Sequence, residues 1–260
     1  MSKTRVLPFE GVDNFRDYGD YATAAGRRIH PGRLYRSANH AAATDGDLEA
    51  MAALKLAVIV DLRRAEERRR NPSRRPKAFA AQVIDNDIDD RPEDPWLTFL
   101  KDSDLSAASL RGYLMGYYRA APFEARHVDL FTRYFRAVAD ADGPVLIHCA
   151  AGKDRTGLLA AFTHHLVGVH GDDIAEDYLP TNDEARFERR GPMVVQNLSE
   201  AAGRPADMAI ARIAMGVDAA YLAEAFRAIE AEYGSIDAYL ERALGVDDAL
   251  RERVEARLLA

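Results

Sequence analysis

Segment 145–166 limits the possible folds of this chain more than any other. Residues 145–147 form a short apolar run that is typical of a buried strand, and residues 156–166 carry leucine and phenylalanine at helical spacing. A loop of small and polar residues joins the two. A strand that passes through a short loop into a helix is the unit of α/β proteins, so we expect a central, mostly parallel sheet flanked by helices.

The joining loop reads His148-Cys149-Ala150-Ala151-Gly152-Lys153-Asp154-Arg155-Thr156-Gly157. A loop that leads into a helix presents several backbone N–H groups to one point, and the helix dipole adds positive potential there. We therefore expect the loop to bind an anion. Because the same environment favours the thiolate form of a cysteine, Cys149 is the candidate nucleophile.

Side chains around the cysteine suit a phosphoryl group. The guanidinium of Arg155 can donate to two phosphoryl oxygens at once, which a lysine cannot do. Gly152 allows a turn or a close approach that a side chain would block. We expect Thr156 to donate a hydrogen bond to the sulfur when it leaves as thiolate, His148 to fix the loop through its ring nitrogens, and Lys153 to add a cation at the mouth.

Displacement at phosphorus also calls for a general acid at the leaving oxygen, and two sources are open. We favour Asp154, because a carboxylate inside an anion-binding loop needs a reason and its position relative to the cysteine is fixed. The alternatives are Asp87, Asp89 and Asp90, which follow a predicted strand and lie on a separate loop.

The loop resembles the active-site loop of the atypical bacterial protein-tyrosine phosphatases that also act on phosphoinositides, the group with mycobacterial and listerial secreted members. The resemblance spans nearly the whole chain in the same order. Its other blocks are 14–19, 32–37, 60–63 followed by Glu66 or Glu67, 177–182 and 233–245. The chain departs from the family pattern at Tyr18, Asp20 and Pro180.

This resemblance implies a cysteine-phosphatase fold and a hydrolase of dual specificity. It implies Cys149 as the nucleophile that forms a phosphocysteine, Arg155 as the phosphate-binding residue and Asp154 as the general acid. Lys153, together with Asp154, implies activity on phosphoinositides as well as on phosphotyrosine. The expected substrate-binding residues are Ala150, Ala151, Gly152, Lys153 and Thr156.

A second group of charged residues is expected behind the loop. Asp61 ends a predicted buried strand at the edge where α/β proteins place their sites. We hypothesise that Asp61 and Arg36 or Arg16 form a network that orients the loop, with Arg63 beside it. A purely structural ion pair is an equally open interpretation.

Length and composition bound the class of protein. The chain of 260 residues suffices for one sizeable core and has no linker or repeat, so we predict a single domain over 1–260. No window approaches the roughly 18 apolar residues of a membrane span, and residues 1–10 lack the apolar centre of a secretory signal. The lone cysteine excludes an internal disulfide, and we expect a cytoplasmic protein. A net charge of −7 argues against nucleic acid as a partner.

Charge is unevenly distributed over residues 63–94. Basic residues dominate 63–77, which is either a solvated helix end and loop or a surface for transient contact with anionic membranes. The acidic residues after it lack the glycine and the bidentate ligand of a calcium loop, so we predict no calcium site. His164, His165 and His170 lack a carboxylate cluster. We predict no metal and no cofactor, because a thiolate already supplies the nucleophile.

Hydrophobic patterns outline the other elements. Strands are predicted near 33–36, 57–62, 81–84 and 145–148. Thr44 and Asp47 resemble a capping box for a helix to about Leu54. Pro122 suits the first turn of a helix that runs through Asp140. N-cap candidates for three C-terminal helices are Asp218, Ser235 and Asp247, so the C-terminal part is predicted to be helical.

Two segments allow more than one interpretation. Residues 91–121 look like an insertion, and helical packing explains their aromatic side chains better than ligand stacking does. Residues 182–216 contain expected breaks at Gly191-Pro192 and at Gly203-Arg204-Pro205. This second segment either closes over the site as a lid or forms ordinary surface helices.

Three function classes are compatible with the loop. The leading one is a phosphomonoesterase that acts on phosphotyrosine proteins and on phosphoinositides. A phosphate-binding pseudophosphatase would need no nucleophile, so the intact Cys149, Asp154 and Arg155 argue against it. A rhodanese-like sulfurtransferase also sets a cysteine loop before a helix, but persulfide transfer has no use for a general acid.

Overall fold

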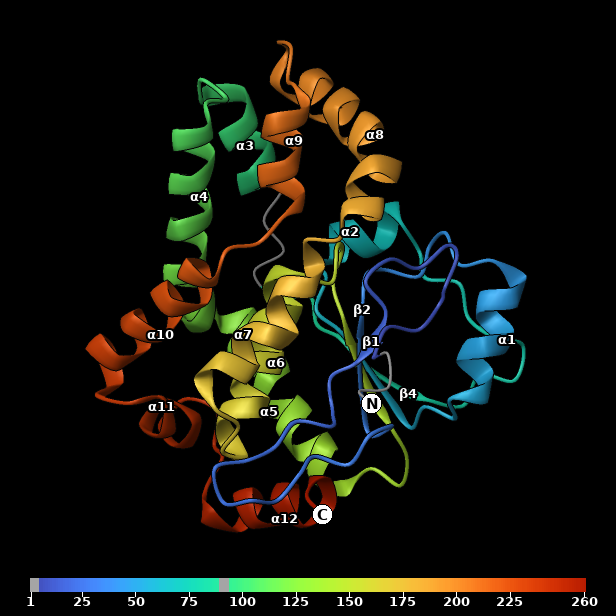
Figure 1. The fold of residues 1–260 in the computed structure, drawn as a ribbon, viewed down its shortest axis with the longest axis vertical. Helices are drawn as coiled ribbons and strands as arrows, with labels where there is room; N and C mark the ends of the chain where they lie inside the picture. Colours follow the sequence, from blue (N-terminus) through green and yellow to red (C-terminus); the bar gives the residue numbers. More distant parts are fainter. Residues whose placement is uncertain (1–4, 89–93) are drawn as a thin grey trace.

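A computed structural model describes residues 5–88 and 94–260 of the chain. Its centre is one sheet with the strand order β1-β2-β5-β3-β4 (Figure 1). Strands β2, β5, β3 and β4 are parallel, and β1 pairs antiparallel with β2 at one edge. The strands are β1 Arg16–Asp17, β2 Leu34–Ser37, β3 Val58–Asp61, β4 Gln82–Ile84 and β5 Val145–His148. The predicted α/β class is confirmed.

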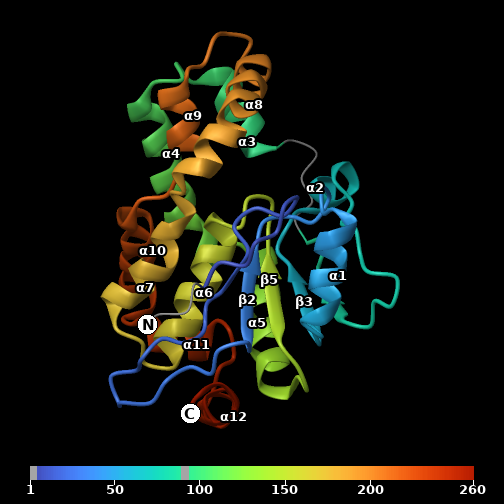
Figure 2. The same ribbon diagram turned by 45° about the vertical axis from the view of Figure 1, so that its right-hand side comes forward.

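Helices surround this sheet and also extend beyond one end of it (Figures 1 and 2). They are, in chain order, α1 Asp45–Ala53, α2 Ala65–Arg70, α3 Pro95–Asp102, α4 Ala107–Ala120, α5 Ala125–Asp140, α6 Asp154–Leu166, α7 Gly171–Tyr178, α8 Glu184–Ala202, α9 Met208–Met215, α10 Ala219–Tyr233, α11 Ile236–Arg242 and α12 Asp248–Leu258. No helix in the described ranges is long and apolar enough to cross a membrane.

The central strands are buried on both faces, which is why the sequence shows them as continuous apolar runs. Alternate residues go to opposite sides. Ile59 and Leu146 join Met51 of α1 in one cluster, whereas Val60 and Ile147 belong to the larger core on the side of α5 and α6. The four predicted strands are confirmed, while β1 has only two residues and was missed for that reason.

The N-terminus of α1 confirms the predicted capping box. Thr44 Oγ1 accepts from the Asp47 amide at 3.1 Å, and Asp47 Oδ2 accepts from the Thr44 amide at 2.9 Å. We expect Thr44→Ala to lower the free energy of unfolding by about 1 kcal/mol, because one helix amide loses its partner. Thr44→Ser keeps the hydroxyl and is expected to match the wild type. Urea denaturation of the two variants checks this; equal loss in both would contradict it.

The expectation for Pro122 is wrong. Pro122 lies in a 3₁₀ turn, Ala121–Phe123, that follows directly on α4. Glu124 then takes an extended conformation with ψ 127°, which separates that turn from α5. The end of α5 at Asp140 is as predicted, and the three C-terminal N-caps at Asp218, Ser235 and Asp247 are confirmed.

Helices α3, α4, α8 and α9 stand together as a helical lobe beyond one end of the sheet (Figures 1 and 2). Phe99 stacks on Trp96 and on Tyr113 within it, with the Phe99 and Tyr113 ring centres 4.3 Å apart, so helical packing of the aromatic residues is confirmed. Helix α8 runs unbroken through Gly191-Pro192, where a break was expected. The expected break at Gly203 is present, and its φ of 66° ends the helix.

Candidate active site

The cysteine loop lies at the carboxyl edge of the sheet, between the end of β5 and the start of α6, on the side that the helical lobe faces (Figure 2). Cys149 is 2% exposed. Helix α6 begins at Asp154, two residues earlier than the sequence pattern indicated, so Asp154 and Arg155 belong to its first turn. Their side chains therefore start from the rigid end of a buried helix rather than from a free loop.

Polar side chains behind the loop hold its carbonyl groups. Asn39 Nδ2 donates to Ala150 O at 2.9 Å. Asn14 Nδ2 donates to Ala151 O at 3.2 Å and to Gly152 O at 3.0 Å, and Arg36 adds a bond to Gly152 O at 3.0 Å. In a trans peptide the N–H points opposite to the C=O. The amides that follow these carbonyls therefore point away from the side chains that hold the loop, towards its inner side.

Gly152 has the close approach that the sequence predicts. Its φ is 67°, and a Cβ there would lie 2.5 Å from the carbonyl carbon and oxygen of Ser37 at the end of β2. Only a residue without a side chain fits both the backbone conformation and the contact. The loop is thus packed tightly against the neighbouring strand.

Arg155 is fixed by a carboxylate from α2. Its Nη1 lies 2.5 Å from Glu67 Oε2 and its Nη2 lies 2.8 Å from Glu67 Oε1, and Nη1 also donates to Leu62 O at 3.1 Å. Burial raises the pKa of Glu67, but the charge and hydrogen bonds of Arg155 outweigh this effect and lower the pKa to about 2. Burial lowers the pKa of Arg155, but the carboxylate of Glu67 outweighs this effect and holds the pKa well above its ordinary value. The guanidinium is a permanent cation with a set orientation.

Asp154 lines a cavity of about 270 Å³ together with Arg155 and Glu67. Its Oδ1 accepts from the hydroxyl of Tyr118 at 2.9 Å. Of the alternative acids, Asp87 pairs with Arg68 and its side chain is 72% exposed. Asp89 and Asp90 lie outside the described residues. Asp154 is therefore the described candidate that lines the same cavity as Arg155.

A nucleophile loop of this geometry agrees with the comparison to known families. The sequence model of the tyrosine phosphatase family matches residues 7–260. The chain belongs to the tyrosine phosphatase family. The predicted membership and enzyme class are confirmed.

Two relatives named as phosphatases match nearly the whole chain. A protein of Cupriavidus necator whose name assigns it to the tyrosine-protein phosphatases is 35% identical over 94% of this chain and 85% of its own. The triple specificity protein phosphatase PtpB of Mycobacterium tuberculosis is 33% identical over 98% of this chain and 99% of its own. Among solved structures, TpbA of P. aeruginosa covers 75% of this chain and 96% of its own at 20% identity, with a TM-score of 0.31.

The expected network of Asp61 with Arg36 or Arg16 is wrong. Asp61 pairs with Arg63, whose Nε and Nη2 lie 2.9 and 2.7 Å from its two carboxylate oxygens. His148 does not fix the loop through hydrogen bonds: among the described residues neither ring nitrogen has such a partner, and Nε2 lies 3.5 Å from Asp61. Burial, only partly opposed by Asp61, lowers the pKa of His148 to about 4, so the ring is neutral at pH 7.

The carboxylate that pairs with both arginines is Asp177 of α7, to which the sequence analysis gave no role. Asp177 Oδ2 lies 2.5 Å from Arg36 Nη1, and Oδ1 lies 3.3 Å from Arg16 Nε. Arg36 reaches the phosphatase loop at Gly152, and Arg16 reaches it through Asn14 Oδ1 at 2.5 Å. Two buried arginines on neighbouring strands were the signal that called for a buried acid.

Of two further expectations, the structure contradicts the one for Lys153 and does not test the one for Thr156. Lys153 does not stand free at the mouth: it is 5% exposed, and its Nζ donates to Ala214 O at 2.6 Å and Gly216 O at 3.0 Å at the end of α9. It thereby ties the loop to the helical lobe. The hydroxyl of Thr156 is buried and has no hydrogen-bond partner in the described part of the chain, and its hydrogen bond to the departing thiolate stays a prediction.

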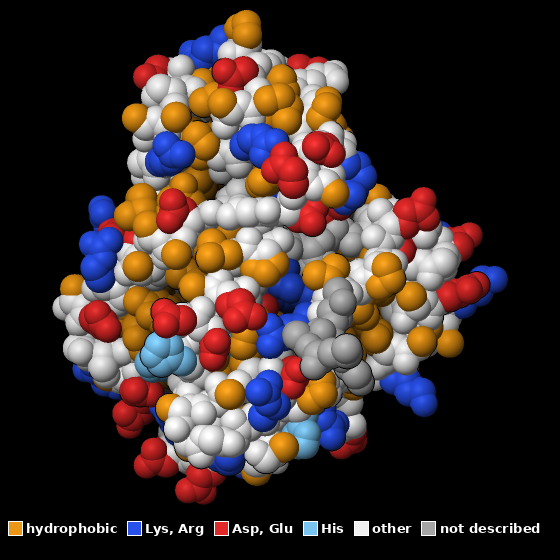
Figure 3. Space-filling model, viewed as in Figure 1, with side chains coloured by type: hydrophobic (Ala, Val, Ile, Leu, Met, Phe, Trp, Pro, Cys, Tyr) orange, Lys and Arg blue, Asp and Glu red, His pale blue; other side chains and the backbone are white. Residues whose placement is uncertain are grey.

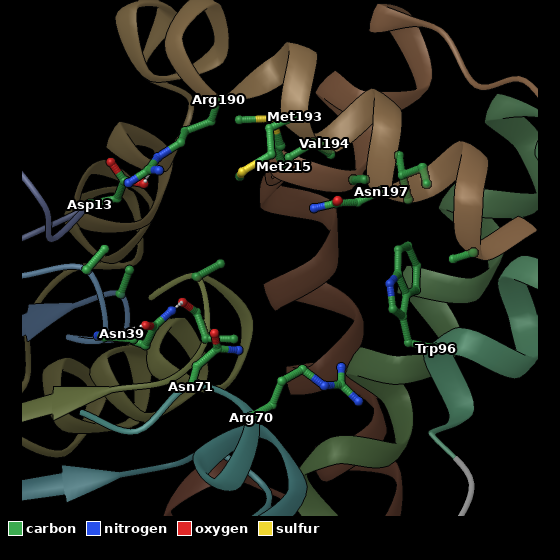
Figure 4. Close-up of a pocket in the computed structure, with 18 of the residues that line it drawn as sticks. Asp13, Asn39, Arg70, Asn71, Trp96, Arg190, Met193, Val194, Asn197 and Met215 are labelled. Atoms are coloured by element: carbon green, nitrogen blue, oxygen red, sulfur yellow. Dashed lines mark hydrogen bonds and ion pairs between the residues drawn. The ribbon is translucent and has the colours of Figure 1, made fainter. Parts of the chain in front are cut away.

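A larger cavity of about 600 Å³ lies between the loop and the helical lobe (Figure 4). Trp96, Met193, Val194 and Met215 supply an apolar wall, and Asp13, Asn39, Asn71 and Arg190 supply a polar one. On the face seen in Figure 3, hydrophobic side chains gather where the lobe meets the body. Helices α8 and α9 thus border the site, and whether they move as a lid stays a prediction.

The basic segment 63–77 is only partly free for a partner. Arg63 is buried with Asp61, Arg68 donates to Asn86 O at 3.1 Å, and Arg74 lies 2.6 Å from Asp45. These contacts favour the interpretation as a helix end and loop held by local pairs. Contact of this segment with anionic membranes stays a prediction.

Proposed function

We propose that this phosphatase hydrolyses phosphomonoesters of phosphotyrosine proteins, and of phosphoinositides, through a phosphocysteine intermediate. The observation that carries the proposal is the fixed guanidinium of Arg155 at the same cavity as Asp154, on the loop that begins at the buried Cys149. Together they supply a cation for the phosphoryl oxygens, an acid for the leaving oxygen and a nucleophile for phosphorus.

The proposed reaction has two displacements. The thiolate of Cys149 attacks phosphorus, the P–O bond to the leaving group breaks, and Asp154 gives its proton to the leaving oxygen. Water then attacks the phosphocysteine, Asp154 takes a proton from that water, and phosphate and thiolate are released. Arg155 and the inward-turned loop amides bind the phosphoryl oxygens in both steps.

Substrate range is the finer part of the proposal. The relative from Mycobacterium tuberculosis is named a triple specificity phosphatase, which supports a range wider than phosphotyrosine. The cavity of about 600 Å³ beside the loop offers room for groups next to the phosphate. The buried position of Lys153 means that a phosphoinositide would meet the α9 carbonyls and this ammonium together, rather than a free lysine.

The test is phosphate release from a phosphotyrosine peptide, a phosphoserine peptide and monophosphorylated phosphoinositides. Wild type and Cys149→Ser are compared under reducing conditions. We expect release from the phosphotyrosine peptide and from at least one lipid, and none by the variant. Absence of release from every substrate by folded, reduced wild type would refute catalysis and favour a phosphate-binding pseudophosphatase.

A further inference from the structure

We propose that Tyr118 is the positioning residue of the general acid: it holds one oxygen of Asp154 so that the other delivers the proton. The proposal rests on the function proposed above, which makes Asp154 the acid. It starts from an unusual placement, since Tyr118 belongs to α4 of the helical lobe, whereas Asp154 is the first residue of the helix that follows the cysteine.

The two oxygens of Asp154 have different surroundings. Oδ1 accepts from the Tyr118 hydroxyl at 2.9 Å and lies 3.7 Å from Lys153 Nζ. Within the described residues no donor reaches Oδ2. When the carboxyl group is protonated, a donor already occupies Oδ1, so the proton is placed on Oδ2. That is the oxygen left for a substrate in the cavity that Asp154 shares with Arg155.

Tyr118 itself cannot turn away. It is fully buried, its ring is stacked on Tyr221 with centres 5.4 Å apart, and Tyr117 packs edge-on against it. Its hydroxyl also contacts that of Tyr178, which is buried beside Gly157 at the start of α6. A ring held on several sides keeps its hydroxyl at one point, as precise positioning of a catalytic group requires.

The direction of proton donation follows from the number of protons. Tyr118 has one hydroxyl proton, and the carboxylate of Asp154 can only accept, so Tyr118 donates to Asp154 and Tyr178 donates to Tyr118. Burial and the nearby Asp154 raise the pKa of Tyr118 well above its ordinary value, which keeps the donor protonated. The pair therefore also stabilises the carboxylate that forms once the proton has left.

The experiment measures kcat/KM of Tyr118→Phe on p-nitrophenyl phosphate and on phenyl phosphate. Phenol is the poorer leaving group and depends more on the acid. We expect about 10- to 100-fold loss on phenyl phosphate, the range for one lost hydrogen bond to a charged group, and a much smaller loss on p-nitrophenyl phosphate. In an Asp154→Asn background the Tyr118 change is expected to add nothing.

The matched control is Tyr134→Phe. Tyr134 is equally buried and its hydroxyl lies 2.8 Å from those of Tyr18 and Thr163, away from the loop. This control is expected to leave the dependence on the leaving group unchanged, whatever it does to stability. If Tyr118→Phe fails to fold, Tyr178→Phe takes its place and is expected to act in the same direction with a smaller loss.

Three results would overturn the positioning role. The first is a loss of kcat/KM in Tyr118→Phe that is equal on phenyl phosphate and p-nitrophenyl phosphate. The second is no loss on either ester in folded Tyr118→Phe and Tyr178→Phe. The third is a loss in Tyr134→Phe that depends on the leaving group as it does in Tyr118→Phe. If folded wild type turns over neither phosphate ester, the proposed function itself fails and this role with it. If wild type is active and the Tyr118 and Tyr178 variants have its kcat/KM values on both esters, only the role of Tyr118 is refuted.

Discussion

Replacing Glu67 with glutamine is expected to lower kcat/KM for an aryl phosphate by about 100- to 1000-fold. The pair is only partly buried, with 24% of the Glu67 side chain exposed, so loss of the carboxylate is expected to cost about 3–4 kcal/mol. About 1.4 kcal/mol corresponds to a factor of ten in rate. Glutamine would also turn an N–H group towards the guanidinium of Arg155, which has no acceptor. The arginine then loses the bidentate contact that sets its plane.

The matched control for this prediction is on the same helix. Glu66 lies at the surface and pairs with Arg69 and Arg70, at 3.0 and 3.3 Å, rather than with Arg155. Glu66→Gln is expected to stay within about twofold of the wild type, because exposed pairs contribute little. A similar loss of activity in both variants would mean that α2 acts through its overall charge, and the role of Glu67 as an anchor would be refuted.

The ionisation of Glu67 sets the pH range over which its pair with Arg155 supports activity. The pKa of Glu67 is lowered to about 2, so its stabilisation is complete above the ordinary glutamate range and is lost only as the pH falls towards 2. The ratio of wild-type to Glu67→Gln activity is therefore expected to be constant between pH 5 and 8. Steady-state rates of both proteins across that interval check this, and a ratio that decreases as the pH is lowered from 8 to 5 would contradict it.

The conformation of the cysteine loop could be predicted from the sequence because its constraints are local. A strand, a glycine that must approach the next strand and a helix start lie within about twenty consecutive residues, and each has its own sequence signature. The choice between Glu66 and Glu67 could not be made in the same way. It depends on which face of the short helix α2 is turned towards Arg155, and that follows from tertiary packing.

Pairings across long sequence distances account for the other differences. Asp61 was matched with arginines 25 and 45 residues away, yet it pairs with Arg63, two residues on. The true partner of Arg36 is Asp177, which lies 141 positions along the chain. A sequence shows that a buried arginine needs an acid, but not which of the many carboxylates of an acidic chain is buried beside it. Tyr118 was likewise assigned to packing, because a hydroxyl partner is invisible in a hydrophobic pattern.

Asp177→Asn is expected to lower the free energy of unfolding by about 3–5 kcal/mol at pH 7, because it leaves the buried guanidinium groups of Arg16 and Arg36 without their carboxylate. Although burial alone would raise it, these two arginines hold the pKa of Asp177 below its ordinary value. A carboxylate whose pKa is lowered by folding stabilises the fold fully above the ordinary aspartate pKa. This stabilisation is lost progressively as the pH falls from that value to the lowered pKa. Wild type and variant are thus expected to converge in stability as the solution becomes acidic.

Urea denaturation at pH 7 and at about pH 2.5 measures both effects, because the stabilisation is lost only well below the ordinary aspartate pKa. The control is Asp237→Asn, since Asp237 pairs with Arg251 at 2.5 Å but its side chain is 59% exposed, and its loss is expected to cost less than about 1 kcal/mol. A difference below 1 kcal/mol for Asp177→Asn at pH 7 would show that the buried pair merely offsets its own desolvation. Arg36 donates to Gly152 O, and Arg16 contacts Asn14, which itself donates to the loop carbonyls. A large difference would therefore mean that the acid on α7 stabilises the residues that pack behind the cysteine loop.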